Sequence, residues 1–78
     1  MPDFGERLSL LVSSELPHAR RDVHRLSLMI ERLSAALGLV IAVGARGNVT
    51  DAETLAEGSR HYIDQEIVEK LKVGRLLG

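Results

Sequence analysis

The stretch that decides the fold is residues 23–40, which read VHRLSLMIERLSAALGLV. Its apolar residues follow one another at alternating intervals of three and four: Val23, Leu26, Ile30, Leu33, Leu37 and Val40. This heptad spacing is typical of a helix that packs along a narrow seam. Four further apolar residues widen the surface beyond one seam: Leu28, Met29, Ala36 and Ile41. We therefore expect a helix over residues 18–44 with more than one packing neighbour.

A shorter helix is predicted before this stretch, over residues 3–16. Four apolar residues share one helical face there: Phe4, Leu8, Leu11 and Val12. Pro17 disrupts a helix interior but suits the first turn of a helix. The sequence therefore predicts that the first helix ends before Pro17 and that the next begins beside it.

A third helix is predicted over residues 50–73. Thr50 and Glu53 have the spacing of a capping box, in which Thr50 is the N-cap residue. Gly44 and Gly47 separate this helix from the preceding one. An apolar series at helical spacing follows: Leu55, Tyr62, Ile63, Ile67 and Leu71.

These elements predict an all-α fold, namely an antiparallel helical hairpin preceded by a short amphipathic helix, within a single domain of residues 1–78. The two long helices have complementary charge. Residues 18–32 carry four arginines against Asp22 and Glu31, whereas residues 51–72 carry six acids against Arg60, Lys70 and Lys72. Because a hairpin seam would leave apolar surface uncovered, we also expect a homodimer.

A different structure is conceivable at residues 39–47, which read LVIAVGARG. A run of this kind can be a buried strand over residues 39–43 that leads into a glycine-containing phosphate loop. The stretch has only two glycines and no Lys-Ser or Lys-Thr pair, and no further strand is predicted to pair with it. The helix is the favoured interpretation.

The composition of the chain excludes several classes of function. The chain has 78 residues, a formal net charge of −1 and no cysteine, which excludes disulfides, thiolate metal sites and thiol nucleophiles. We predict no nucleic-acid partner, because the near-neutral charge supplies no bulk attraction to phosphate. We predict no membrane association either, since the longest apolar stretch, residues 33–43, is shorter than the roughly 20 residues of a membrane span. We expect a cytoplasmic location, and we expect no cofactor and no bound metal.

Two groups of polar residues could bind a metal. His18, Asp22 and His24 lie close together in sequence but lack a further well-placed ligand. Glu57, His61 and Asp64 share a helical face, where the two carboxylates could also adjust the pKa of His61 for proton transfer. On an exposed helix such a strip is usually a solvated, salt-bridged surface, which is the interpretation we favour.

The second half of the chain resembles a known family. Residues 47–55 read GNVTDAETL and residues 59–69 read SRHYIDQEIVE, while Ile30, Leu33 and Leu37 match an apolar pattern in the preceding helix. Over residues 30–71 the chain resembles the sporulation-type aspartyl-phosphate phosphatases, whose second helix carries a Ser-Gln-x-Leu-Asp signature. Ser34 stands where that family usually has Arg, and Arg60 where it has Gln. Ser59 and Asp64 are five residues apart rather than four.

The resemblance implies a small regulatory protein that docks the receiver domain of a response regulator and dephosphorylates it. Asp64 would be the catalytic side chain, together with Ser59 and Gln65. These side chains would orient a water for in-line attack, and the regulator would supply the Mg²⁺.

The alternative is a non-catalytic helical interaction module or accessory subunit, which dimerises or caps a larger partner. Asp64 is then a solvated surface residue. A dephosphorylation assay on phosphorylated receiver domains distinguishes these two functions.

Overall fold

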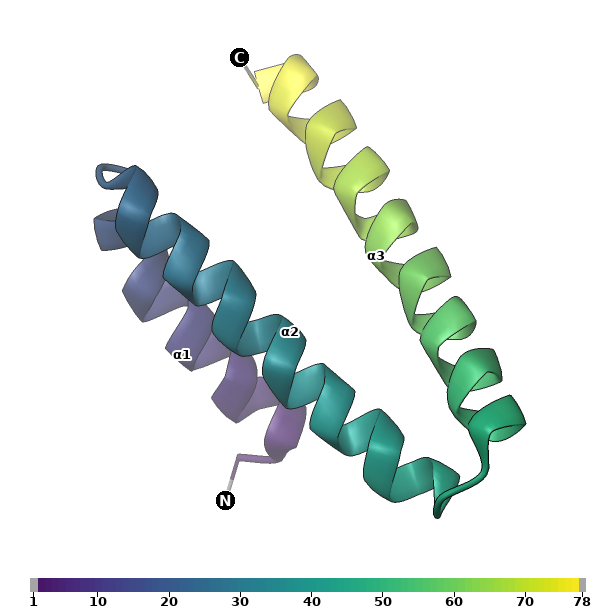
Figure 1. Ribbon diagram of the computed structural model, residues 1–78. Coiled ribbons are helices and arrows are strands. Elements are labelled where there is room, and N and C mark those ends of the chain that lie inside the picture. Colours follow the sequence, from purple (N-terminus) through teal and green to yellow (C-terminus); the bar gives the residue numbers. More distant parts are fainter. Residues whose placement is uncertain (1, 78) are drawn as a thin grey trace. The chain divides into compact units, whose positions relative to one another are not determined.

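The computed structural model describes residues 2–77, and side chains as far as Gly74. It contains three helices: α1 (Phe4–Ala19), α2 (Val23–Ala45) and α3 (Val49–Leu77) (Figure 1). No strand occurs within residues 2–77, so the all-α prediction is confirmed. The strand considered for residues 39–43 is wrong, because these residues lie inside α2. Met1 and Gly78, the ends of the predicted domain, lie outside the described residues.

The break between the first two helices lies later than predicted. α1 continues through Pro17 to Ala19, and α2 begins at Val23 rather than at residue 18. The physical reason is the Asp22 side chain, whose Oδ1 accepts hydrogen bonds from the backbone N–H groups of His24 (3.0 Å) and Arg25 (3.3 Å). These are donors that a helix start leaves without intrahelical acceptors, so Asp22 fixes the first residue of α2.

Asx side chains also begin the other two helices. Asp3 Oδ1 accepts a hydrogen bond from the Glu6 N–H at 2.8 Å, and Asn48 Oδ1 accepts one from the Asp51 N–H at 3.0 Å. The predicted capping box at Thr50 is therefore wrong. Thr50 lies inside α3, where its carbonyl oxygen accepts a hydrogen bond from the Thr54 hydroxyl at 3.0 Å.

The turn between α2 and α3 is short and uses left-handed backbone. The Asn48 N–H donates to the Ala45 carbonyl oxygen at 3.0 Å, which closes a four-residue turn. Its two central residues have positive φ angles, 52° at Arg46 and 81° at Gly47. Glycine adopts this conformation readily, whereas a residue with a Cβ atom, such as Arg46, is strained in it by about 1–2 kcal/mol.

The chain groups into two compact units, residues 1–36 and residues 37–78. The first unit contains α1 and the first part of α2, which run antiparallel beside each other (Figure 1). The second contains residues 37–45 of α2, the turn and α3. The division does not decide the prediction of a single domain, because the two units share the continuous helix α2.

Each unit buries very little. Among the described side chains only Ala19, in the first unit, and Ala45, in the second, are buried. In the second unit α2 meets the start of α3, where a Cβ atom built on Gly44 would lie 3.7 Å from Leu55 Cδ1. Most of the large apolar side chains on all three helices are exposed, which leaves extensive apolar surface for contacts outside each unit.

The cap at Asn48 gives a direct test of where α3 begins. Asn48→Ala should lower the free energy of unfolding by about 0.5–2 kcal/mol, because it leaves the Asp51 N–H without its acceptor. Thr50→Ala should leave stability nearly unchanged, since Thr50 lies within the first turn and Ala has a high helix propensity. Thermal unfolding followed by circular dichroism measures both. A larger loss of Tm for Thr50→Ala than for Asn48→Ala would contradict the assignment.

Candidate functional site

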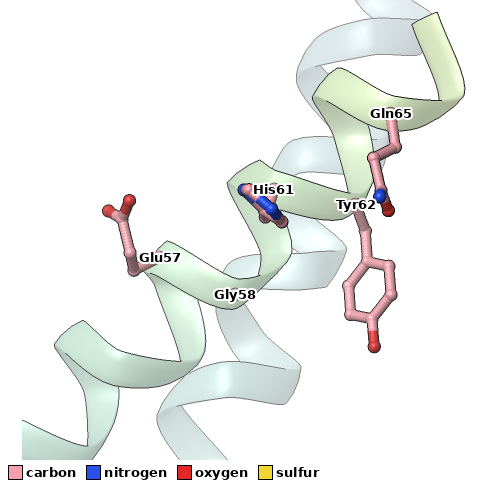
Figure 2. Close-up of a pocket in the computed structure, with 5 residues that line it drawn as sticks. All are labelled: Glu57, Gly58, His61, Tyr62 and Gln65. Atoms are coloured by element: carbon pink, nitrogen blue, oxygen red, sulfur yellow. The ribbon is translucent and has the colours of Figure 1, made fainter.

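The predicted site residues lie on α3, but they do not form one cluster. Asp64 and Gln65 are exposed and line one shallow depression on the helix surface, together with His61, Val68, Glu69 and Lys72. A neighbouring depression is lined by Glu57, Gly58, His61, Tyr62 and Gln65 (Figure 2). His61 and Gln65 belong to both. Polar groups that could hold a water or contact a partner therefore follow one another along this side of α3.

Ser59 is not part of this surface. Its hydroxyl donates a hydrogen bond to the Leu55 carbonyl oxygen at 2.9 Å, and the residue is half-buried and lines neither depression. A separation of five residues turns Ser59 away from Asp64 by about 140° around a helix of 3.6 residues per turn. The structure thus brings Asp64 and Gln65 together and leaves the third predicted residue, Ser59, hydrogen-bonded to its own helix.

The acid–histidine strip of α3 is an exposed surface. Glu57 pairs with Arg60 at 3.7 Å, and Glu66 pairs with Lys70 at 3.5 Å. Both pairs are between neighbours on one helix, and such exposed pairs contribute little to stability. Within residues 2–77 no group of three or more His, Asp or Glu side chains has an arrangement that could hold a metal ion.

A bidentate ion pair joins α1 to α2. The carboxylate of Glu15 accepts two hydrogen bonds from the guanidinium of Arg25, one from Nε and one from Nη2, the latter at 3.1 Å. This bidentate geometry holds the pKa of the Glu15 carboxyl below its ordinary value. The contact lies in the first unit, whereas Asp64 and Gln65 lie in the second, so the perturbed carboxyl is a structural group of the α1–α2 pair.

Two apolar surfaces were not predicted from the sequence. The first is a groove between α1 and α2, walled by Leu8, Leu11, Val12, Met29 and Leu33, with Arg32 also lining it. The second, which we call the α2 patch, consists of Leu39, Val40 and Val43, which are 66%, 64% and 69% exposed. The alternation of apolar residues indicates which of them share a face of a helix, but it does not indicate which faces the neighbouring helices leave open.

Comparison with known proteins adds no family. No protein-family model, curated protein or solved structure matches the chain.

The ion pair between Glu15 and Arg25 should make stability depend on acid pH. A carboxyl whose pKa is lower in the folded protein stabilises it above the unfolded pKa, about 4.3 for Glu, and this stabilisation is lost as the pH falls through the folded pKa. We expect Glu15→Gln to lower the urea midpoint at about pH 7, and the difference from the wild type to shrink as the pH falls through the folded pKa, below which the carboxyl is protonated in both states. A difference between the two proteins that stays the same throughout an acid titration would contradict this role.

Proposed function

We propose that this chain is a non-catalytic helical interaction module that binds a larger protein through the α2 patch. The observation that carries the proposal is the exposure of Leu39, Val40 and Val43, three large apolar side chains at the end of a helix. Soluble monomeric proteins rarely expose large contiguous apolar patches, and such patches mark interaction sites.

The position of the patch supports a partner other than α3. Leu39 and Val43 are four residues apart and Val40 and Val43 three, so the three side chains share one face of α2. The contact with α3 lies elsewhere on the helix, where Ala45 is buried and Ile41 is half-buried. The unit therefore uses one side of α2 internally and leaves another side for the partner.

The apolar character of this end of α2 extends all round the helix. Residues 35–45 read AALGLVIAVGA and contain no polar side chain. A helix in contact with one neighbour needs only one apolar face, whereas a helix that is apolar all round is normally enclosed. We infer that the partner covers more than a narrow strip of α2.

A protein fits this role better than a lipid bilayer. α2 is long and apolar enough to cross a membrane, with a mean hydropathy of 1.9 over its most apolar 18 residues. However, α1 runs antiparallel to α2 within the first unit, where Glu15 meets Arg25 and Leu8 lines the same groove as Leu33. This arrangement sets Glu6 and Arg7 beside the middle of α2. Charged groups at the centre of a bilayer are strongly unfavourable.

The patch can be tested by cross-linking in the cells that produce the protein. A photo-reactive residue at Leu39 should form an adduct with one defined protein, whereas the same residue at Leu10 should not. Leu10 is a matched control because it is 65% exposed but lies on α1.

Val43→Asp should weaken binding of that protein at least about tenfold, because an unpaired carboxylate would be buried in the interface. Leu10→Asp should leave affinity unchanged, and circular dichroism should show equal helix content in both variants. Equal affinity of the Val43→Asp variant and the wild type would contradict the proposal.

A second candidate function is dephosphorylation of a response regulator. Its support is the shared depression of Asp64, Gln65 and His61, whose polar side chains could hold a water beside a docked receiver domain. Since an aspartyl phosphate is labile and the receiver domain would bind the Mg²⁺, the helix need only position the attacking water. In this second candidate function, Asp64 and Gln65 would position the attacking water, whereas the Ser59 hydroxyl would stay hydrogen-bonded to the Leu55 carbonyl oxygen of its own helix.

Asp64→Ala decides between the two candidates. A phosphatase should lose at least about tenfold in the rate of receiver dephosphorylation, with unchanged thermal stability, because Asp64 is exposed. An interaction module should show no phosphatase activity in the wild type and unchanged partner binding in the variant. The measurement is loss of phosphate from receiver domains of the same genome, with Glu53→Ala as the matched acid control on α3.

We also propose that the module self-associates. In such an assembly α3 would pair antiparallel with α2, and two copies of the chain would form a homodimer. Both features are expected from the sequence. Its support is the small amount of side-chain burial in each unit, since a fold of this size needs further apolar contacts.

A further inference from the structure

Few contacts hold the turn between α2 and α3 in its bent form (Figure 1). The Asn48 N–H donates to the Ala45 carbonyl oxygen at 3.0 Å, and the Asn48 side chain caps α3 by accepting from the Asp51 N–H at 3.0 Å. The backbone of Arg46 opposes these hydrogen bonds, because its φ of 52° lies in the left-handed region. A residue with a Cβ atom is strained there, so the turn itself disfavours the bent form.

The packing beside the turn is also slight. A Cβ atom built on Gly44 would lie 3.7 Å from Leu55 Cδ1, and on the α2 side Ala45 is buried. Three residues of α3 near the turn are half-buried, and all have small side chains: Ala52, Ala56 and Ser59. The free energy gained on burial is proportional to the apolar area that is covered, and small side chains cover little. This contact therefore holds the bent form only weakly.

No proline separates α2 from α3. Proline is the residue that interrupts a helix most strongly, and both prolines of the chain precede residue 18. Ala45 and Arg46 are strong helix formers, and Gly47 is the weakest helix former of the turn. In one continuous helix, the N–H groups that begin α3 would find acceptors among the carbonyl groups that end α2. These backbone hydrogen bonds would replace those of the cap and the turn.

We propose that residues 46–48 are a hinge, at which the second unit changes between the bent form and an open form with one continuous helix from α2 into α3. Two packings of one sequence can interconvert when their free energies differ little. Opening removes α3 from α2 and uncovers the side of α2 that carries Ala45. Because residues 35–45 contain no polar side chain, the open form exposes apolar surface there too. If the proposed function holds, the hinge regulates how much of α2 a partner can reach.

Two neighbouring substitutions should shift this equilibrium in opposite directions. Gly47→Ala strains the bent turn, where the φ of Gly47 is 81°, and favours a continuous helix. Arg46→Gly relieves the bent turn and disfavours a continuous helix. We expect Gly47→Ala to raise the ratio of open to bent form at least about tenfold, and Arg46→Gly to lower it at least about tenfold.

Pulsed electron paramagnetic resonance distinguishes the two forms by distance. Spin labels are attached at Ala42→Cys and Gly58→Cys, in a chain without other cysteines. Ala42 is exposed, and a Cβ atom on Gly58 would meet nothing within 4 Å, so both positions accept a label. In a continuous helix the two backbone positions are about 24 Å apart. In the bent form both lie within one helical turn of the contact between Gly44 and Leu55, which places them less than about 18 Å apart.

We expect both distances in the labelled wild-type background, mainly the long one with Gly47→Ala and mainly the short one with Arg46→Gly. An excess of unlabelled protein confines the measurement to labels within one chain. A single short distance in all three proteins would overturn the proposal.

Thiol reactivity provides a second measurement with a matched control. Ala45 is 4% exposed in the bent form, so the reaction of Ala45→Cys with a maleimide should be faster with Gly47→Ala and slower with Arg46→Gly. Ala19 is 1% exposed but belongs to the first unit, so Ala19→Cys should react at the same rate in all three backgrounds. Equal changes at both positions would indicate general unfolding and would overturn the hinge. The proposed function fails separately, since it depends on adducts at Leu39.

Discussion

Side-chain caps and one ion pair define this fold, because side-chain burial contributes so little within each unit. Asp3, Asp22 and Asn48 each accept a hydrogen bond from a backbone N–H of the first helical turn. A cap of this kind contributes about 1 kcal/mol, which sets where a helix begins but does not by itself hold helices together. The bidentate contact of Glu15 with Arg25 joins α1 to α2, and burial of Ala19 and Ala45 adds small contacts. In our proposal, further stabilisation comes from apolar surface that is covered between molecules.

That constraint connects the fold to its function. Large apolar side chains are exposed on every helix of this small chain, and we propose that association covers them and adds to the stability of the fold. The α2 patch, the groove of the first unit and the second half of α3 are surfaces of this kind. In our account apolar contacts between two copies complete the fold, and the α2 patch remains available for another protein. The polar side of α3 around Asp64 and Gln65 is then free to contact that protein or a receiver domain.

Several features followed from the sequence for clear physical reasons. The heptad spacing through residues 23–40 predicted a helix, and the structure has one there, including residues 39–43, which could also have formed a strand. The helix boundaries were harder to predict, because both Pro17 and Thr50 belong to residue types that favour helix starts. Asp22 and Asn48, which lie a few residues away and also favour helix starts, are the residues that cap. An N-cap depends on the local backbone as well as on residue type, and the turns at residues 20–22 and 46–48 determined that backbone.

The five-residue interval between Ser59 and Asp64 already implied that these two residues lie on different faces of α3. The ion pair of Glu15 with Arg25 could not be predicted without knowing that α1 and α2 run antiparallel.

The central claim, that contacts between molecules complete this fold, is tested most directly by following helix content and mass together on dilution. Sedimentation equilibrium and far-ultraviolet circular dichroism would be recorded on the same samples from high to low protein concentration. The account predicts a dimer at high concentration, and a loss of helix content over the range in which the dimer dissociates. A monomer whose helix content and melting temperature stay constant at every concentration would contradict it.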